Sequence, residues 1–365
     1  MSTNWNDLWD QVCEQLRVTG QDILRAAPPD ELTRAEGLRY LSRLFRYAVG
    51  RQLDPYFPMR PELTYERVRI GGDNPDYRYV GALLDGRLNY RLRGRVNDTD
   101  RIGFGTYSGG LGTSEGLKCT GSLDSSSLTL SDDGAFDIML SSEPQNGAWL
   151  PMSSNTNTLT IRETLLRSGT ARPADYEIVC LTPTADPTFM DAEALRQGFD
   201  RSRLFMSGTV RQFLGWTATF RRRSNEILPL PPQLLAAAQG DKSTAYFNGY
   251  YELRSDQALA VTFTPPRCDY WNLQACNHWL ESIDPLRAPT HYNNETAALR
   301  RNGSVVIVIA ASDPGVPNWI DTAGHLQGGI AMRIVGASPS EGLDPPLCRL
   351  LPLCDVAAAF PMGSP

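Results

Sequence analysis

The sequence predicts a mainly β protein with helical additions: two antiparallel β-sandwich or jelly-roll units, an N-terminal helical hairpin and a helical bridge. Gly (31) and Pro (26) are frequent among the 365 residues, which favours turns and short strands over long helices. Short β-like runs, separated by Gly, Asn and Asp and with no helices between them, fill two stretches of the chain. Such runs are typical of antiparallel sandwiches. The length allows about two domains.

We expect five segments in chain order. The divisions follow the changes from helical to strand-like spacing and back. They are an N-terminal helical segment (1–60), a first β-sandwich (61–188), a helical bridge (189–241), a second, jelly-roll-like β unit (242–338) and a proline-rich C-terminal arm (339–365).

The first segment is expected to form two amphipathic helices. Between residues 5 and 49 apolar side chains recur every three or four positions, as on one face of a helix. Ala27-Pro28-Pro29-Asp30 separates the helices, and Thr33 with Glu36 has the spacing of a capping box that opens the second one. The residues expected to pack on the first sandwich are Leu38, Leu41, Phe45 and Ala48.

The two β regions flank a helical stretch. In the first region, Asp132-Asp133-Gly134 is a hairpin signal that divides one of the runs. Residues 191–223 have helical spacing, and a short helix is expected at 232–239. The prolines after Gly336 favour an extended arm over the surface. The expected strands lie within 88–96, 102–107, 128–140, 159–166, 176–181, 246–253, 259–264, 270–275, 304–311 and 330–335.

Composition excludes several classes of partner. The net charge is −6, with 35 basic and 41 acidic residues and no long basic run, so we expect no nucleic-acid binding. No apolar stretch approaches the length of a membrane span, and the N-terminus lacks the pattern of a signal peptide. The seven cysteines are scattered without a C-x-x-C pair, which favours free thiols and a cytoplasmic location, with a Cys348–Cys354 bridge as the alternative. A homo-oligomer is open.

Four stretches together carry a family resemblance. They are 31–37 with Arg39-Tyr40-Leu41, then Gly72-Asp73-Asn74-Pro75-Asp76, then 270–279, and Asp313-Pro314-Gly315 with Asn318-Trp319. The chain resembles bacterial proteins of the domain-of-unknown-function family 1214. The resemblance implies a β-sandwich or jelly-roll fold, often with a partner β domain, and it implies no catalytic residues.

The first candidate site is Asp73-Asn74-Pro75-Asp76. Asx residues around a proline favour a turn in which the side chains bond the local backbone. The functional alternative is substrate binding by Asp73, Asn74 and Asp76, with the two carboxylates as acid/base groups or as oxygen ligands for a hard cation. Both readings stay open.

The second candidate site is the segment from Asp313 to His325, which follows an apolar strand. It offers the carboxylates of Asp313 and Asp321, the amide of Asn318 and the indole of Trp319, although a well-ordered turn explains the same residues. We expect His325 to lie beside a cavity near Trp319 and within reach of a carboxylate. Asp313 or Asp321 with His325 would then act as acid and base.

The other candidates are a second proton carrier, an anion partner and an aromatic face. His278 or His291 could carry the second proton, and Arg333 could bind an anion or an oxyanion. The three histidines lack zinc-site spacing and no dinucleotide fingerprint is present, so we expect no metal and no cofactor. Tyr270, Trp271 and Tyr292 could line a binding face, with core packing as the alternative.

These residues indicate two functions from different classes. The first is a cofactor-independent enzyme that uses general acid/base chemistry on a small organic molecule, terpenoid, steroid or sugar-like. Lyase, isomerase, cyclase and hydrolase reactions are all open. The alternative is a non-catalytic β-sandwich protein that binds a carbohydrate or a hydrophobic ligand. In both, the partner is a small molecule.

Overall fold

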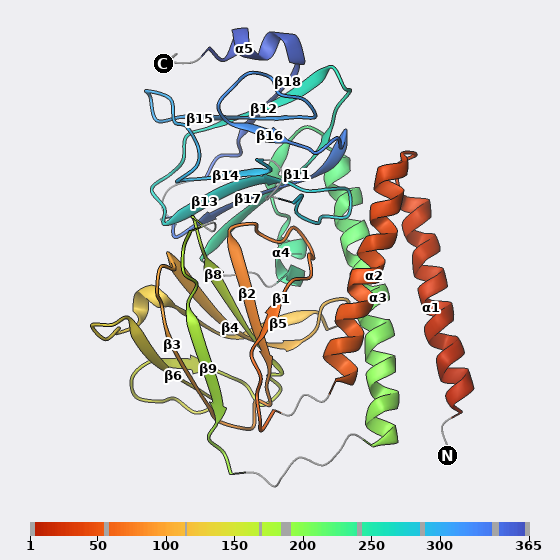
Figure 1. Cartoon of the computed structure of the whole chain (residues 1–365), viewed down its shortest axis with the longest axis vertical. Helices are drawn as coiled ribbons and strands as arrows, with labels where there is room; N and C mark the ends of the chain where they lie inside the picture. The colour runs from red at the N-terminus through yellow and green to blue at the C-terminus, as the bar shows by residue number, and fades with distance from the viewer. Residues whose placement is uncertain are drawn as a thin grey trace.

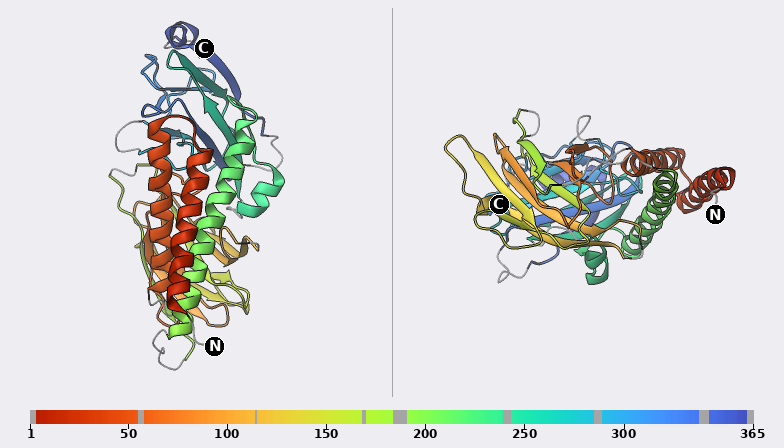
Figure 2. Two further views of the ribbon diagram at one scale, coloured as in Figure 1. Left: turned by 90° about the vertical axis from the view of Figure 1, so that its right-hand side faces the viewer. Right: turned by 90° about the horizontal axis from the view of Figure 1, so that it is seen from below.

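The computed structural model describes residues 4–54, 58–113, 115–167, 170–183, 191–238, 243–284, 289–337 and 343–361. Two β-sandwiches stack along the long axis of the molecule, and three long helices run along one side of the stack (Figures 1 and 2). The predicted mainly β fold with helical additions is confirmed.

The first sandwich consists of two facing sheets. One has the order β1 (Thr64–Glu66), β2 (Tyr77–Leu83), β8 (Thr158–Thr164), β4 (Arg101–Gly109) and β5 (Leu117–Asp124), and the other β7 (Trp149–Pro151), β6 (Ala135–Ser141), β3 (Tyr90–Arg95) and β9 (Asp175–Cys180). Leu92, Phe104, Ile138 and Ile161 fill the space between the sheets. A 3-10 turn, Ser125–Ser127, follows β5.

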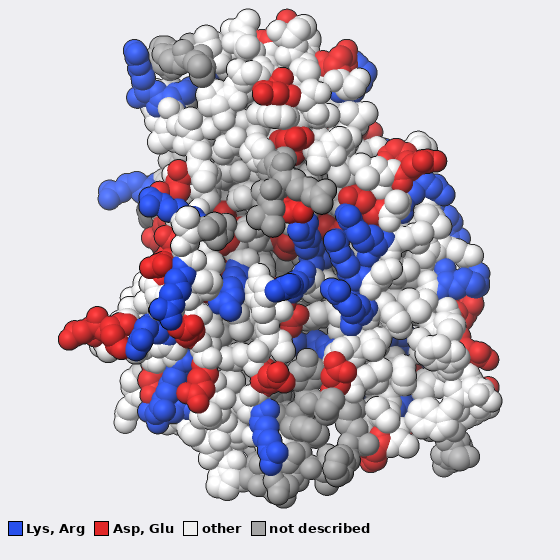
Figure 3. All heavy atoms as spheres, viewed as in Figure 1, with Lys and Arg blue, Asp and Glu red and all other residues white. Residues whose placement is uncertain are grey.

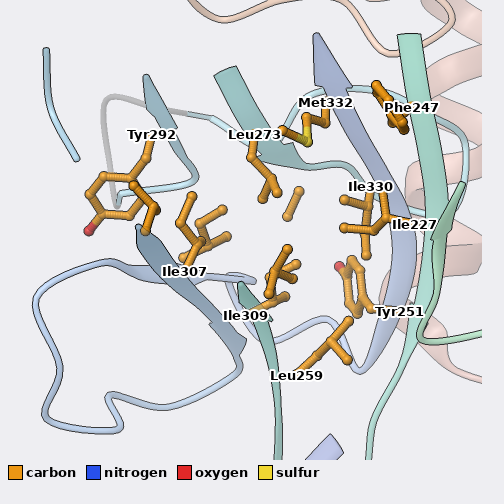
Figure 4. Close-up of a cluster of buried hydrophobic side chains, with 14 of the residues drawn as sticks. Ile227, Phe247, Tyr251, Leu259, Leu273, Tyr292, Ile307, Ile309, Ile330 and Met332 are labelled. Atoms are coloured by element: carbon orange, nitrogen blue, oxygen red, sulfur yellow. The ribbon is translucent and has the colours of Figure 1, made fainter. Parts of the chain in front are cut away.

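The second sandwich repeats this plan. One sheet has the order β10 (Ile227–Pro229), β11 (Thr244–Glu252), β17 (Gln327–Val335), β13 (Tyr270–Ala275) and β14 (His291–Asn293), and the other β16 (Trp319–Asp321), β15 (Val305–Ala310), β12 (Gln257–Phe263) and β18 (Leu347–Pro352). Apolar side chains from both sheets interlock between them (Figure 4). In the described strands of both sandwiches, the pairs β6–β7 and β15–β16 are parallel and the others antiparallel.

Three helices form a layer of their own: α1 (Trp5–Ala26), α2 (Glu31–Leu53) and α3 (Ala192–Arg221), which lie side by side (Figure 2). The helical hairpin is confirmed, but its expected packing is wrong. Leu41 and Leu44 pack against α3 and against Trp279 of the second sandwich, and Leu38 is exposed. The 30-residue α3 supplies the apolar partner that the first sandwich was expected to supply.

Local details correct four further expectations. The N-cap of α2 is Asp30, whose side chain accepts from the Thr33 amide at 2.8 Å, so Thr33 does not open a capping box. Residues 128–130 form no strand. The bridge contains β10 and the C-terminal arm contributes β18, which pairs with β12, because short apolar runs between prolines still fit a sheet edge. The expected boundaries 188/189, 241/242 and 338/339 lie outside the described residues.

The remaining helices are short: α4 (Pro232–Ala238), the 3-10 turn Leu353–Asp355 and α5 (Val356–Ala359). None of the helices among the described residues combines the length and the apolar character that crossing a bilayer requires. Cys348 and Cys354 are free thiols, so the alternative bridge between them is not formed in this structure.

The two sandwiches meet along a seam between the sheet containing β2, β8 and β4 and the sheet containing β11, β17 and β13. The segment 69–76, which leads into β2, runs along this seam and docks on the second sandwich. The Gly72 amide donates to the Leu280 carbonyl at 2.6 Å, and Arg69 donates to the Ser282 carbonyl at 2.6 Å. A pocket lies in this seam.

Candidate functional site

The seam pocket has a volume of about 280 Å³ and is lined by both sandwiches, by α2 and by α3. One part of its wall is apolar and includes Ile70, Phe213 and Trp216. The other part is polar and titratable. It includes Glu66, Asp73, Tyr77, Tyr79, Arg162 and Arg333.

Strand alternation places the two arginines in the pocket. Side chains of a strand point alternately to its two faces. On β8, Leu159 and Ile161 are fully buried in the sandwich core, so Arg162 projects from the opposite face into the seam. On β17, Met332 and Ile334 belong to the core of the second sandwich, and Arg333 projects into the seam from the other side.

Each arginine has a tyrosine as its cross-strand neighbour. Arg162 on β8 lies opposite Tyr79 on β2, and Arg333 on β17 lies opposite Tyr246 on β11. All four residues line the pocket. Each sandwich therefore presents to the seam a guanidinium beside a cross-strand phenol, and the first sandwich adds a second phenol, that of Tyr77.

The two guanidinium groups are held by neutral acceptors. Arg162 donates to the Tyr107 hydroxyl at 2.8 Å, and Arg333 donates to Oε1 of Gln274 at 2.9 Å and to the Gly72 carbonyl. Gly72 has a φ of +73°, a conformation that favours glycine, and this turn aims its carbonyl at Arg333. Among the described residues, no carboxylate oxygen lies within 4.0 Å of either arginine.

Glu66, on β1, is a titratable carboxyl group of the pocket whose Oε2 has no hydrogen-bond partner among the described residues. Burial raises its pKa, while Arg51, 3.7 Å from Oε1, and the Thr64 hydroxyl act in the opposite direction. A carboxyl group in a pocket wall whose pKa is raised by burial is a candidate for proton transfer.

Asp73 lines the same pocket but is fixed. Its Oδ1 accepts from the Ser282 amide at 2.9 Å and its Oδ2 from the Ser282 hydroxyl at 2.7 Å. Burial raises the pKa of Asp73, and these hydrogen bonds lower it in part. Burial also raises the pKa of Tyr77 and Tyr79, so that both phenols remain hydrogen-bond donors at neutral pH.

Asn74 and Asp76 form the turn that the sequence predicts and also join a buried polar network across the seam. Asn74 Oδ1 accepts from the Asp76 amide at 3.1 Å, which closes the Asx turn. Asp76 accepts from the Tyr270 hydroxyl at 2.7 Å and from Asn293 at 3.0 Å, and it lies 2.9 Å from Nε2 of His291. These side chains tie the start of β2 to the second sandwich.

The segment from Asp313 to Asp321 makes local structural bonds. Oδ1 of Asp313 accepts from the Gly315 amide at 2.8 Å, and Oδ1 of Asp321 accepts from the Ala323 amide at 2.7 Å. The Asn318 side chain bonds Ala298 and Val306, and the Trp319 indole donates to the Ala310 carbonyl at 3.0 Å. None of these residues lines the seam pocket.

The aromatic candidates also lie outside the seam pocket, and each has a structural role elsewhere. Trp271 is a core residue between the sheets of the second sandwich, in edge contact with Phe263. The Tyr292 hydroxyl donates to the carbonyls of Pro317 and Trp319, which fixes the loop before β16. Tyr270 belongs to the buried polar network across the seam.

None of the three histidines lines the seam pocket. His325 is within reach of a carboxylate, as expected, but that carboxylate is Glu36 of α2, 2.8 Å away, and neither Asp313 nor Asp321. His278 Nδ1 lies 2.6 Å from the Tyr250 hydroxyl, and burial lowers its pKa to about 4. Within the described part of the chain, no three His, Cys, Asp or Glu side chains gather as metal ligands would.

Sequence reasoning missed most of the pocket wall, above all Arg162 and Glu66. One signal was present: Arg162 stands among Leu159, Thr160 and Ile161 in a run that otherwise reads as a half-buried strand. A charged residue on the outer face of a sandwich usually points to solvent, and the sequence does not show that this face meets a second sandwich.

Comparisons with known proteins identify a relative of known structure. No protein-family model and no curated protein matches the chain. An uncharacterized protein from Burkholderia cenocepacia, solved by crystallography, is 36% identical over 95% of this chain and 97% of its own, with a TM-score of 0.89. The VPA0106 protein from Vibrio parahaemolyticus aligns over 94% of this chain and 99% of its own at 12% identity, with a TM-score of 0.49.

Proposed function

The chain belongs to the family of the Burkholderia cenocepacia protein, and on that premise we propose that it is a cofactor-independent enzyme that acts by proton transfer on a small organic molecule bound in the seam pocket. One observation carries the proposal. Glu66, a carboxyl group whose pKa burial raises, lies in the wall of a pocket that also presents hydrogen-bond donors and an apolar surface.

The roles follow from the contacts. Glu66 would accept a proton from the substrate or return one, because burial raises its pKa and so favours the protonated carboxyl more than water does. Tyr77 and Tyr79, kept protonated by their burial, would donate to an oxygen on which negative charge develops. Phe213 and Trp216 would hold the apolar part of the substrate and exclude water. Lyase, isomerase, cyclase and hydrolase reactions all use such steps.

The second candidate is a protein that binds a hydrophobic or sugar-like ligand without turnover. The aromatic side chains of Phe213 and Trp216 favour it, because they offer flat surfaces on which a ring can stack. In that case Glu66 would orient the ligand and would not exchange a proton with it.

A screen in D₂O separates the two. Wild-type protein is incubated with a library of small metabolites, and ¹H NMR follows both deuterium incorporation and product formation, while thermal shift reports binding. We expect a compound that binds and reacts, and we expect Glu66→Gln to slow the reaction by about a hundredfold or more while binding persists. Glu177→Gln, at an exposed position on β9, is the matched control.

Two outcomes would go against the enzyme. Compounds that bind without exchange or product would favour the binding protein. A reaction that Glu66→Gln leaves at the wild-type rate would remove Glu66 from the chemistry.

Kinship with the domain-of-unknown-function family 1214 is a second part of the proposal. It is supported by the four sequence stretches that carry the resemblance, of which 72–76 forms a seam turn in this structure. A family profile built from relatives of the Burkholderia cenocepacia protein tests it: the profile should align those four stretches in both groups.

A further inference from the structure

We propose that the molecule bound in the seam pocket is an organic anion, with its charged group held between Arg162 and Arg333 and its apolar body against α3. The inference rests on the proposed function in that it concerns the same pocket, and it adds the chemical class of the ligand. Arg162 comes from the first sandwich and Arg333 from the second, so the anion would bind both halves of the molecule.

The two guanidinium groups keep donors for a ligand. A guanidinium has five N–H groups and stays charged in a protein. Arg162 donates one hydrogen bond to the Tyr107 hydroxyl. Arg333 donates one to Gln274 and one to the Gly72 carbonyl. Because a bidentate carboxylate or phosphate needs two adjacent N–H groups, both side chains retain the capacity to bind one.

Among the described residues, the acidic residues of the pocket form no ion pair with these two arginines, although Asp73 lies close enough to Arg333 to interact with its charge. Glu66 lies near Arg51, and Asp73 is bound through both oxygens to Ser282. Two cations in the walls of one pocket, each without a carboxylate within 4.0 Å among the described residues, repel each other and are poorly solvated. A bound anion would relieve both effects.

The surface where α2 meets the seam also carries positively charged side chains. The chain as a whole is acidic, with a net charge of −6, yet Lys and Arg side chains gather over the middle of the molecule, where α2 meets the seam (Figure 3). Arg39 and Arg43 lie one turn apart on α2, and Arg43 and Arg69 bond the neighbouring residues Glu281 and Ser282. Arg39 pairs with Glu36 and Arg43 with Glu281, so the charge that remains for an anion at the seam is that of Arg162 and Arg333.

The shape of the pocket limits the ligand to a compact molecule. A volume of about 280 Å³ is at the small end for ligand pockets, and Phe213 and Trp216 form its apolar wall. The ligand is therefore a molecule with an anionic head group and a small aromatic or aliphatic body. A carboxylate and a phosphate ester both satisfy it, and the probes must distinguish them.

Calorimetry with three probes of similar size tests the inference: phenylacetate, phenyl phosphate and the neutral phenylacetamide. We expect at least one of the two anions to bind wild-type protein, and phenylacetamide to bind at least about tenfold more weakly. The anion that binds more tightly identifies the head group as a carboxylate or a phosphate. Failure of both anions to bind, or equal affinity for the neutral probe, would overturn the inference.

Variants assign the binding to the two arginines. Arg162→Gln should lower the affinity for the anion by about tenfold or more, and Arg162→Lys should recover part of this loss. Arg172→Gln, at an exposed position, is the control and should bind as wild type does. Arg333→Lys provides a second, charge-conserving variant from the other sandwich, and circular dichroism checks that each variant is folded. Unchanged affinity in both folded Arg162→Gln and Arg333→Lys would overturn the inference.

The two proposals fail separately. Anion binding that depends on Arg162, without any turnover in D₂O, would preserve this inference and remove the enzyme. Turnover of a neutral compound that depends on Glu66 but not on Arg162 would preserve the enzyme and remove this inference.

Discussion

Glu36 of α2 and His325, which precedes β17, are hydrogen bonded between Oε2 and Nε2 at 2.8 Å, although 289 positions separate them in the chain. The other ring nitrogen, Nδ1, lies 2.6 Å from the Thr322 carbonyl. Because both ring nitrogens face acceptors, the ring is favoured in its doubly protonated form. Burial by itself would lower the pKa of His325, but the Glu36 carboxylate raises it above the ordinary value of 6.5. The pair is a buried ionic link between the helical layer and the second sandwich.

This link predicts a stability window in pH. His325 has a raised pKa, so its contribution is complete below pH 6.5 and is lost as pH rises through the higher folded value. Burial alone would raise the pKa of Glu36, but His325 and Arg39 lower it below 4.5, so its contribution is complete above pH 4.5 and is lost as pH falls through the lower folded value. We expect urea-unfolding midpoints of wild type and His325→Gln to differ most between pH 4.5 and 6.5. A difference that is constant from pH 4 to 8 would contradict the ion pair.

His278 should have the opposite effect on acid stability. Burial, helped by the nearby Arg221, lowers its pKa to about 4, so the unfolded chain takes up a proton at a higher pH than the folded protein does. The unfolding free energy should then fall by at most about 1.4 kcal/mol per pH unit from pH 6.5 down to 4. The unfolding free energy of His278→Gln should lack this dependence on pH. At pH 8, where the imidazole is neutral in both states, the difference between the two proteins should report only the loss of packing. Parallel pH profiles for the two proteins would mean that His278 is not buried as described.

Two glycines of α2 should respond oppositely to the same substitution. A Cβ at Gly37 would lie 2.5 Å from Cγ2 of Ile23 and 2.6 Å from Cζ2 of Trp279, so Gly37→Ala should destabilise the protein by about 1–3 kcal/mol. At Gly50 the nearest atom would be Oδ2 of Asp54 at 3.5 Å, so Gly50→Ala should stabilise the helix by about 0.5 kcal/mol. Thermal unfolding of both variants checks the prediction. A stable Gly37→Ala protein would show that α2 does not pack closely on Trp279.

Asp76 and Asp313, both candidates from the sequence, should differ in importance. Asp76 is 3% exposed and accepts hydrogen bonds from Tyr270 and Asn293, so Asp76→Asn should cost about 2–4 kcal/mol. Asp313 lies in an exposed turn, and Asp313→Asn should change stability by less than about 0.5 kcal/mol. Chemical denaturation measures both, and the turnover assay adds a second test. Loss of activity in a stable Asp313→Asn variant would restore the segment 313–325 as the active site.

Local sequence patterns predicted what local interactions determine. The Asx turn at 73–76 and the helices at 5–26 and 31–53 depend on side chains a few positions apart, and they formed near the expected places. Glu36 shows the limit of such patterns. Its spacing from Thr33 indicates a capping box, but its carboxylate bonds His325, and a spacing of 289 positions leaves no local pattern.

The pocket was harder to predict for a related reason. Arg162 and Arg333 lie on the central strands of two different sheets, and both belong to the faces that a lone sandwich would expose to water. Arg333 was proposed as an anion partner on its chemistry, whereas nothing near Arg162 in the chain distinguishes it from a solvated arginine. Only the stacking of the two sandwiches gives the two residues a common environment.

The distance in sequence between the helical hairpin and its partners has a consequence for biosynthesis. α1 and α2 leave the ribosome well before α3, which begins at Ala192 and supplies Met206 and Val210 to the cluster on their apolar faces. Trp279, which donates from Nε1 to the Thr33 carbonyl, and His325 follow later still. The strands of the first sandwich all lie between residues 64 and 180, so this unit can fold meanwhile, whereas the second sandwich waits for β18 at 347–352. The apolar face of the hairpin is therefore incomplete until Trp279 has been made, and the sandwich that carries Trp279 is incomplete until β18 pairs with β12.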